Sequence, residues 1–196
     1  MPRLIMAALA NFVERRNRIL NAMVLVASLV TLGRRGERVN KIRNPDAPDI
    51  VVLPPVLVGG TLIVGVAIHY LVWTVPLLPT VLARLLGLIV FVSAGILAHL
   101  SHNAMKRVGT NVFPTKPTLA LATDGPYRFT RNPLYIAAIG VYLGVTLWVD
   151  GLAPLLLMFP MAWLLDRGIV LPEERYLEAK FGDAYSRYRS SVRRWL

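Results

Sequence analysis

Cysteine is absent from this chain of 196 residues, and charged residues are scarce, at 17%. Without cysteine there are no disulfides, thiol nucleophiles or cysteine-ligated metals. The sequence also lacks a Gly-rich phosphate loop, a Rossmann fingerprint and a Ser-His-Asp set. Hydrophobic residues make up 55% of the chain, more apolar surface than a soluble domain of this size buries. The composition therefore predicts an integral membrane protein.

Four hydrophobic stretches predict an all-α integral membrane fold with four core transmembrane helices. Each span needs about 20 apolar residues, because lipid offers no hydrogen-bond partners to an exposed backbone. The stretches cover residues 51–73, 81–100, 134–149 and 152–170. The third is short, and only Asp150 and Gly151 separate it from the fourth. We expect these last two to form a helical hairpin.

Basic residues are confined almost entirely to one side of this four-span topology. Lys and Arg number nine in residues 1–44, five in 101–133 and seven in 167–196, and only Arg84 lies elsewhere. Such residues collect on the cytoplasmic side of membrane proteins. We therefore expect both termini and the 101–133 loop in the cytoplasm. Topology and anionic headgroups then explain the net charge of +11, with no nucleic-acid partner.

The N-terminal apolar segment, residues 19–32, is only fourteen residues long and has arginines on both sides. Crossing the membrane would place one of these clusters outside, so we favour a helix in the cytoplasmic interface over a fifth span. A cleaved signal peptide is disfavoured, since no small-residue cleavage site precedes a soluble domain. We expect a basic N-terminal segment and linker over 1–49 and a membrane domain over 50–196.

Functional candidates collect in the loop after the second span and in the tail after the fourth. The loop contains GPYRFTRNPLY at 125–135, whose glycine and prolines stiffen the backbone. The tail begins PEERYLEAKFGDAYSRYR, and its proline followed by Glu173 and Glu174 is typical of a helix start. In a partly desolvated pocket, the same two carboxylates would attract a sulfonium or an ammonium. Both interpretations stay open, and we expect a cytoplasmic C-terminal helix.

These two blocks, in this order and joined by a helical hairpin, resemble the isoprenylcysteine carboxyl methyltransferase and phospholipid methyltransferase family of membrane enzymes. The resemblance covers residues 105–196 and is strongest to short bacterial members, with RNP where eukaryotic members have RHP. It implies S-adenosylmethionine as cofactor and a lipid or lipid-like acceptor, of isoprenoid carboxylate or phospholipid amine type. It also implies an active site at the cytoplasmic face, here of a bacterial inner membrane.

Carried over by position, the resemblance implies a set of cofactor-binding residues. Asn132 stands in place of the family's histidine and cannot shuttle protons near neutral pH. Glu173 matches the cofactor-binding glutamate, and we take it as catalytic together with Arg167. The position of the family's substrate-binding arginine holds Ile169 here. Arg167, two residues earlier, could occupy a similar space only by a different path. The expected cofactor-binding residues are Ala120, Leu121, Ala122, Tyr127, Asn132, Pro133, Leu134, Tyr135, Glu173 and Glu174.

Other polar and aromatic residues receive simpler interpretations. Arg128 and Arg131 are interpreted as basic residues at the membrane interface. The tail aromatics are interpreted as anchors of an interfacial helix. His99 and His102 are three apart but have no third ligand nearby, so we expect interface hydrogen bonds and no metal. The tail aromatics are Phe181, Tyr185, Tyr188 and Trp195.

Two other functions stay open. One is an NADPH-dependent membrane reductase related to sterol reductases, which share a similar C-terminal architecture but are much longer. The other is a non-catalytic membrane subunit of the same fold. For methyl transfer to an amine, a base must remove a proton. Asp124, Glu173 and Glu174 are the acidic candidates, and the sequence does not choose among them.

Overall fold

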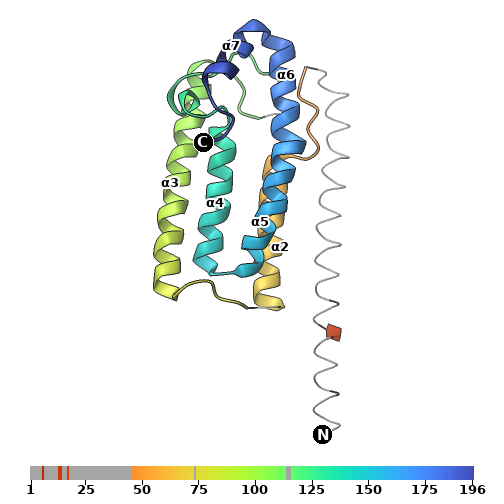
Figure 1. Cartoon of the computed structure of the whole chain (residues 1–196), viewed down its shortest axis with the longest axis vertical. Coiled ribbons are helices and arrows are strands. Elements are labelled where there is room, and N and C mark those ends of the chain that lie inside the picture. Colours follow the sequence, from red (N-terminus) through yellow and green to blue (C-terminus); the bar gives the residue numbers. More distant parts are fainter. Residues whose placement is uncertain (1–5, 7–12, 15–16, 18–45, 73, 114–115) are drawn as a thin grey trace.

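A computed structural model describes residues 6, 13, 14, 17, 46–72, 74–113 and 116–196. Within them, four upright helices form a bundle, α2 (Pro54–Leu71), α3 (Thr80–Arg107), α4 (Pro133–Val149) and α5 (Leu152–Leu165) (Figure 1). Two further helices, α6 (Leu171–Phe181) and α7 (Asp183–Ser191), extend it at one end. The expected all-α integral membrane fold is confirmed. The apolar segment 19–32 lies outside the described residues, and the division between residues 49 and 50 stays a prediction.

Among the described residues, three helices are long and apolar enough to cross a membrane. They are α2, α3 and a continuous helix, Leu152–Phe181, that includes α5 and α6. The fourth, α4, is apolar but has 17 residues, in agreement with the short third stretch of the sequence. The outer face of α3 exposes large apolar side chains, which suits contact with lipid. They include Leu85, Leu88, Ile89, Val92 and Ile96.

Close helix packing depends on small residues. A Cβ atom on Gly87 of α3 would lie 2.6 Å from the backbone nitrogen of Trp148 on α4. A Cβ on Gly65 of α2 would lie 2.6 Å from the Cα of Pro154 on α5. The two helix pairs therefore approach backbone to backbone, as membrane helices do where glycine lies at the contact.

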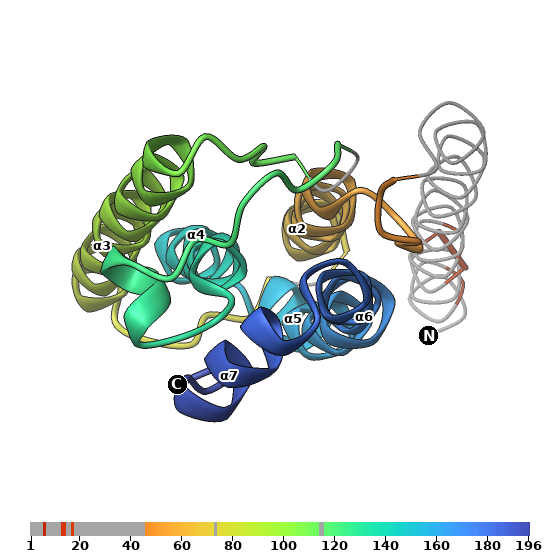
Figure 2. The same cartoon turned by 90° about the horizontal axis from the view of Figure 1, so that it is seen from above.

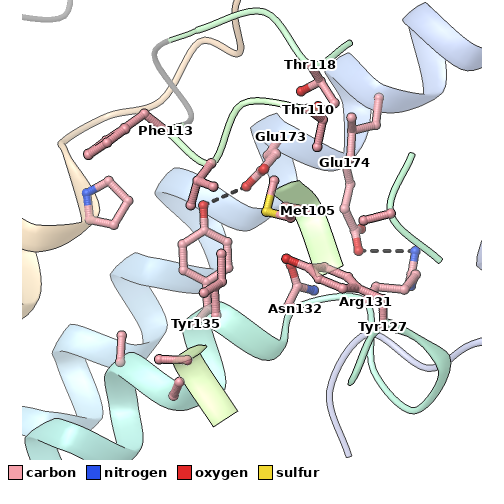
Figure 3. Close-up of a pocket in the computed structure, with 18 of the residues that line it drawn as sticks. Met105, Thr110, Phe113, Thr118, Tyr127, Arg131, Asn132, Tyr135, Glu173 and Glu174 are labelled. Atoms are coloured by element: carbon pink, nitrogen blue, oxygen red, sulfur yellow. Dashed lines mark hydrogen bonds and ion pairs between the residues drawn. The ribbon is translucent and has the colours of Figure 1, made fainter. Parts of the chain in front are cut away.

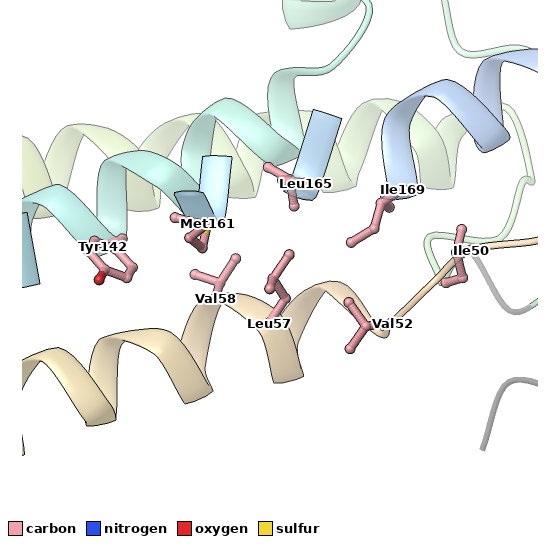
Figure 4. Close-up of a cluster of buried hydrophobic side chains, with 8 residues drawn as sticks. All are labelled: Ile50, Val52, Leu57, Val58, Tyr142, Met161, Leu165 and Ile169. Atoms are coloured by element: carbon pink, nitrogen blue, oxygen red, sulfur yellow. The ribbon is translucent and has the colours of Figure 1, made fainter. Parts of the chain in front are cut away.

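The hydrophobic core lies between α2, α4 and α5 (Figure 4). Tyr142 of α4 is fully buried within it, and its hydroxyl donates a hydrogen bond of 2.9 Å to the Pro154 carbonyl. This satisfies the polar end of an otherwise apolar side chain. The core thus joins α4 to the two helices beside it. Its buried members are Ile50, Val52, Leu57, Val58, Tyr142, Met161, Leu165 and Ile169.

The connections gather at two ends of the bundle. The turn 74–79 and the Asp150–Gly151 turn share one end, called here the turn end. The α3–α4 connection and the C-terminus share the other, the site end (Figure 1). From above, the connection runs from α3 over towards α2 and returns to the 3-10 turn η1 (Gly125–Arg128) (Figure 2). The described basic residues of the connection and tail therefore collect at the site end, while Arg84 lies near the turn end.

Between α5 and α6 the helix continues through a π-helical segment, η2 (Asp166–Val170). The predicted helix start near Pro172 agrees with α6, which begins at Leu171 with Glu173 and Glu174 in its first turn, but the helical backbone enters α6 from η2 without a break. Proline has no N–H to donate to the carbonyl four residues earlier, that of Gly168. Val51 supplies the missing donor, with its backbone N–H 2.8 Å from the Gly168 oxygen. This long-range bond lets the helix run on past the proline.

Candidate functional site

A cavity of about 440 Å³ lies at the site end of the bundle (Figure 3). Its walls come from α2, α3, α4, α6 and α7 and from the α3–α4 connection. Most of the lining is apolar, and polar side chains are concentrated near the connection and α6. Such a cavity suits a mainly apolar ligand oriented by a few polar groups. Apolar members of the lining include Pro54, Val58, Ala98, Met105, Ala138 and Val141.

Tyr135 and Glu173 meet at this cavity. Tyr135 lies in the first turn of α4, which begins at Pro133, and Glu173 lies in the first turn of α6. The tyrosine hydroxyl donates a hydrogen bond of 2.6 Å to a carboxylate oxygen of Glu173 (Figure 3). Hydrogen bonds to a carboxylate are short and strong, especially away from water. The bond fixes the orientation of a carboxylate that lines the cavity.

Glu174, the next residue, is bound by two arginines. Arg194 holds both of its oxygens, with Nη2 at 2.7 Å and Nε at 3.1 Å. Arg131 Nη1 lies 3.1 Å from Oε1 of the same carboxylate. The interpretation of Arg131 as an interfacial residue is therefore wrong, because its side chain is only 9% exposed and is paired in the interior. The hydrogen bonds with Glu174 also raise the pKa of Arg194.

The C-terminal residues tie the α3–α4 connection to α6. The Arg131 backbone N–H donates to the Arg193 carbonyl at 2.9 Å. The Arg194 carbonyl accepts from Thr130 Oγ1 at 2.9 Å and from the Asn132 side-chain amide at 3.0 Å. With its guanidinium on Glu174, Arg194 thus contacts both sides of the site. Asn132, expected in the cofactor set, lines the cavity and has its amide nitrogen committed to this contact.

Three tyrosines line the cavity beside this cluster. The Tyr188 hydroxyl donates 2.7 Å to the Tyr127 carbonyl, and Tyr185 is fully buried. The interpretation of Tyr185 and Tyr188 as interfacial anchors is therefore wrong. Burial, reinforced by the charge of Glu173, raises the pKa of Tyr127, and burial raises the pKa of Tyr185 to about 12. Both phenols stay protonated at neutral pH, so they can orient a ligand but are poor bases.

The α3–α4 connection is held over the cavity by polar contacts. Thr110 Oγ1 accepts from the Leu119 N–H at 2.9 Å and from the Ala120 N–H at 3.4 Å. The Thr118 N–H donates 3.2 Å to the Tyr176 hydroxyl on α6. These contacts hold the backbone of residues 118–120, and residues 120–122 line the cavity.

The structure brings most of the expected site residues to this cavity. Pro133 is the exception in the cofactor set, since it is buried at the start of α4 and does not line the cavity. Arg167 does not lie at the cavity either. Its side chain is 63% exposed and pairs with Asp166 at 3.6 Å. The residues that line it are Ala120, Leu121, Ala122, Tyr127, Asn132, Leu134, Tyr135, Glu173 and Glu174.

The lining residues that sequence reasoning missed include Arg131, Tyr185 and Tyr188, and the Arg194 contact with Glu174 was missed as well. Each depends on a partner far along the chain. For Arg131, the only local signal was its place as the first residue of the RNP motif, and basic residues are ordinary at a membrane interface. The apolar wall from α2 was missed as well, because that helix carries no motif.

The fold and the cavity define a multi-pass helical membrane protein with a largely apolar cavity at one end of its bundle. A sequence model of the family described as phospholipid methyltransferase matches residues 82–184. The match covers more than half of the chain. The chain therefore belongs to the phospholipid methyltransferase family, as the sequence predicted.

Two similar proteins match parts of the chain. An uncharacterized protein of Haemophilus influenzae is 36% identical over 63 residues, which are 32% of this chain and 100% of that protein. A protein-S-isoprenylcysteine O-methyltransferase of Schizosaccharomyces pombe is 33% identical over 72 residues, 37% of this chain. The matched region spans only 30% of the yeast enzyme. No solved structure matches the chain significantly.

Proposed function

We propose that the protein is an S-adenosylmethionine-dependent methyltransferase. Its acceptor is a lipid or lipid-like molecule of isoprenoid carboxylate or phospholipid amine type. The observation that carries this proposal is the Tyr135–Glu173 pair in an apolar cavity at the end of a membrane bundle. Membership of the family and the similarity to a named isoprenylcysteine methyltransferase support it.

The site fits this cofactor in size and charge. A volume of about 440 Å³ lies within the range of small-molecule sites. When bound, S-adenosylmethionine supplies a methyl group on a positively charged sulfur. Glu173 presents a carboxylate to the cavity, and carboxylates in a water-poor site attract a cation strongly. The apolar walls suit a lipid chain.

The residues of the site mainly align the reactants and exclude water. Tyr135 orients the Glu173 carboxylate, and residues 120–122 form part of the cavity wall. For an amine acceptor, Glu173 is the better proton acceptor among the three acidic candidates. Glu174 is engaged by two arginines, and Asp124 is exposed and does not line the cavity.

We further propose that this chemistry takes place at the cytoplasmic face of a bacterial inner membrane. The loop and tail that carry the site are rich in arginine and lysine, and such segments stay on the cytoplasmic side. Acidic headgroups of that leaflet attract the same residues. Accessibility labelling of a cysteine introduced at Arg128 in intact cells tests this, since the chain has no cysteine of its own. Labelling by an impermeant reagent added outside would contradict it.

Calorimetric titration of the purified protein tests the cofactor. We expect binding of S-adenosylmethionine, no binding of NADPH, and loss of S-adenosylmethionine binding in Glu173→Ala. Glu178→Ala is the matched control, because Glu178 lies on the same helix but is exposed and pairs with Arg189. Binding of NADPH alone would favour the reductase, and binding of neither would favour the non-catalytic subunit. S-adenosylmethionine binding that Glu173→Ala leaves unchanged would sink the assigned site.

The acceptor needs a second assay. The protein is incubated with a labelled methyl donor and a total membrane lipid extract, and the products are separated. We expect label in the lipid fraction. Label only in protein or only in water-soluble products would rule out a lipid acceptor.

A further inference from the structure

Arg131 has a buried N–H group that its pairing with Glu174 leaves unused. Nη1 lies 3.1 Å from Glu174 Oε1 and 3.4 Å from the Tyr185 hydroxyl. Nε is buried, and none of the described residues accepts a hydrogen bond from it. A guanidinium has five N–H donors, and a buried donor without an acceptor destabilises the protein. An acceptor atom from a ligand would remove this cost.

The charge of Arg131 is also the less compensated of the two arginine charges. Arg194 binds Glu174 through two nitrogens and lies 4.0 Å from Asp166. Arg131 shares the same Glu174 through a single nitrogen. Its side chain is 9% exposed, so water does little to screen the remaining charge.

Arg131 lines the cavity, and its place there is separate from that of Glu173. Figure 3 shows the Tyr135–Glu173 pair on one side and the Arg131–Glu174 pair on the other, with Asn132 between them. The cavity therefore offers a carboxylate at one position and a cationic donor at another. A ligand with a positive and a negative group, held apart, would match both.

We infer that the Arg131 guanidinium, on a side chain that lines the cavity, binds an oxyanion of the ligand, a carboxylate or phosphate oxygen. The oxyanion has two candidate sources. The first is the carboxylate of the methyl donor, and for this source the inference rests on the proposed function. The other source is an acidic group on the acceptor. Arginine suits either, because its N–H groups match the geometry of carboxylates and phosphates.

Decarboxylated S-adenosylmethionine tests the first source, because it keeps the sulfonium and the amine and lacks the carboxylate. We expect the wild-type protein to bind S-adenosylmethionine roughly 10- to 100-fold more tightly than this analogue in calorimetric titration. Arg131→Gln should lose that difference and bind the decarboxylated analogue as well as the wild type does, which also shows that the variant is folded. Arg128→Gln is the matched control, since Arg128 is exposed in the same loop, and should change neither affinity.

Dodecyl phosphate and dodecanol test the second source, because they share an apolar chain and differ in the oxyanion. If the acceptor supplies the anion, the wild type binds dodecyl phosphate more tightly than dodecanol. Arg131→Gln then loses only this preference for dodecyl phosphate. This arm does not involve S-adenosylmethionine, so it still decides the inference if the cofactor proposal fails. Where Arg131→Gln does not fold, Arg131→Lys replaces it: it keeps the charge, lacks the planar fork and should lose part of the preference. A wild type without preference in both arms, or variants that keep the preference, would overturn the inference.

Discussion

The two ends of the bundle use their carboxylates differently. At the turn end, one oxygen of Asp150 accepts the backbone N–H groups of Leu77 and Leu78 at 2.8 and 3.0 Å. It ties the α2–α3 connection to the α4–α5 turn, and the Leu152 N–H adds a bond to the Val75 carbonyl. At the site end, Glu173 and Glu174 are held by side chains from α4, the α3–α4 connection and the C-terminus. The Asp150 carboxylate binds backbone groups and joins two connections of the fold. The Glu173 and Glu174 carboxylates bind side chains around a cavity.

The contrast shows which end depends on charge. Asp150 can be replaced in part by any good acceptor, because its partners are neutral amides. Glu174 cannot, because its partners are two guanidiniums, one of them buried. Removing one member of a buried ion pair leaves the remaining charge without compensation. Substitutions at the two ends should therefore differ in the size of their effect on stability and in whether they affect ligand binding.

Glu174→Gln is expected to have the largest effect on stability. Arg131 would lose its carboxylate partner in the interior, which costs about 3–5 kcal/mol for buried pairs. Thermal unfolding in detergent measures the change. Glu178→Gln on the same helix breaks an exposed pair with Arg189 and should cost under about 1 kcal/mol. Equal losses in the two variants would show that the buried cluster does not stabilise the site end.

Asp150→Ala is expected to have a smaller effect and to spare the site. Two backbone N–H groups would lose their acceptor, which costs about 1–3 kcal/mol. Asp150 also has a left-handed backbone, φ 53°, which alanine adopts less readily. Asp150→Asn keeps one acceptor oxygen and tolerates that backbone, so it should lose less. The affinity for S-adenosylmethionine should stay at the wild-type value in both Asp150 variants. A loss of affinity as large as that of Glu173→Ala would contradict the contrast between the two ends.

The turn end was largely predictable from the sequence. The third stretch, 134–149, and the turn at Asp150–Gly151 agree with the observed α4 and hairpin within one residue. The signals there are local, because residues 134–149 and 152–165 contain no charged residue and Asp150 lies between them. The Asp150 carboxylate itself lies within the predicted turn.

The site end was predictable only where a motif carried it. The resemblance gave Tyr135 and Glu173, which the structure brings together at 2.6 Å. It did not give the course of the helix through Pro172, because the bond that compensates for the proline comes from Val51, far away in the sequence. Arg131 was misread for the same reason, since its partner Glu174 lies on α6, far along the chain. Hydropathy and charge counts report on neighbours along the chain and not on such pairs.

Tyr135→Phe is expected to have the smallest effect on stability and a clear effect on binding. The substitution removes the O–H donor to Glu173 and keeps the ring against the core. One hydrogen bond to a charged group corresponds to roughly tenfold in affinity, so S-adenosylmethionine should bind about tenfold more weakly in calorimetric titration. Tyr70→Phe is the control, since Tyr70 is 62% exposed near the turn end. Wild-type affinity in Tyr135→Phe would mean that the orientation of Glu173 does not matter for the ligand. A loss in Tyr70→Phe as well would mean that binding is sensitive to both ends of the bundle.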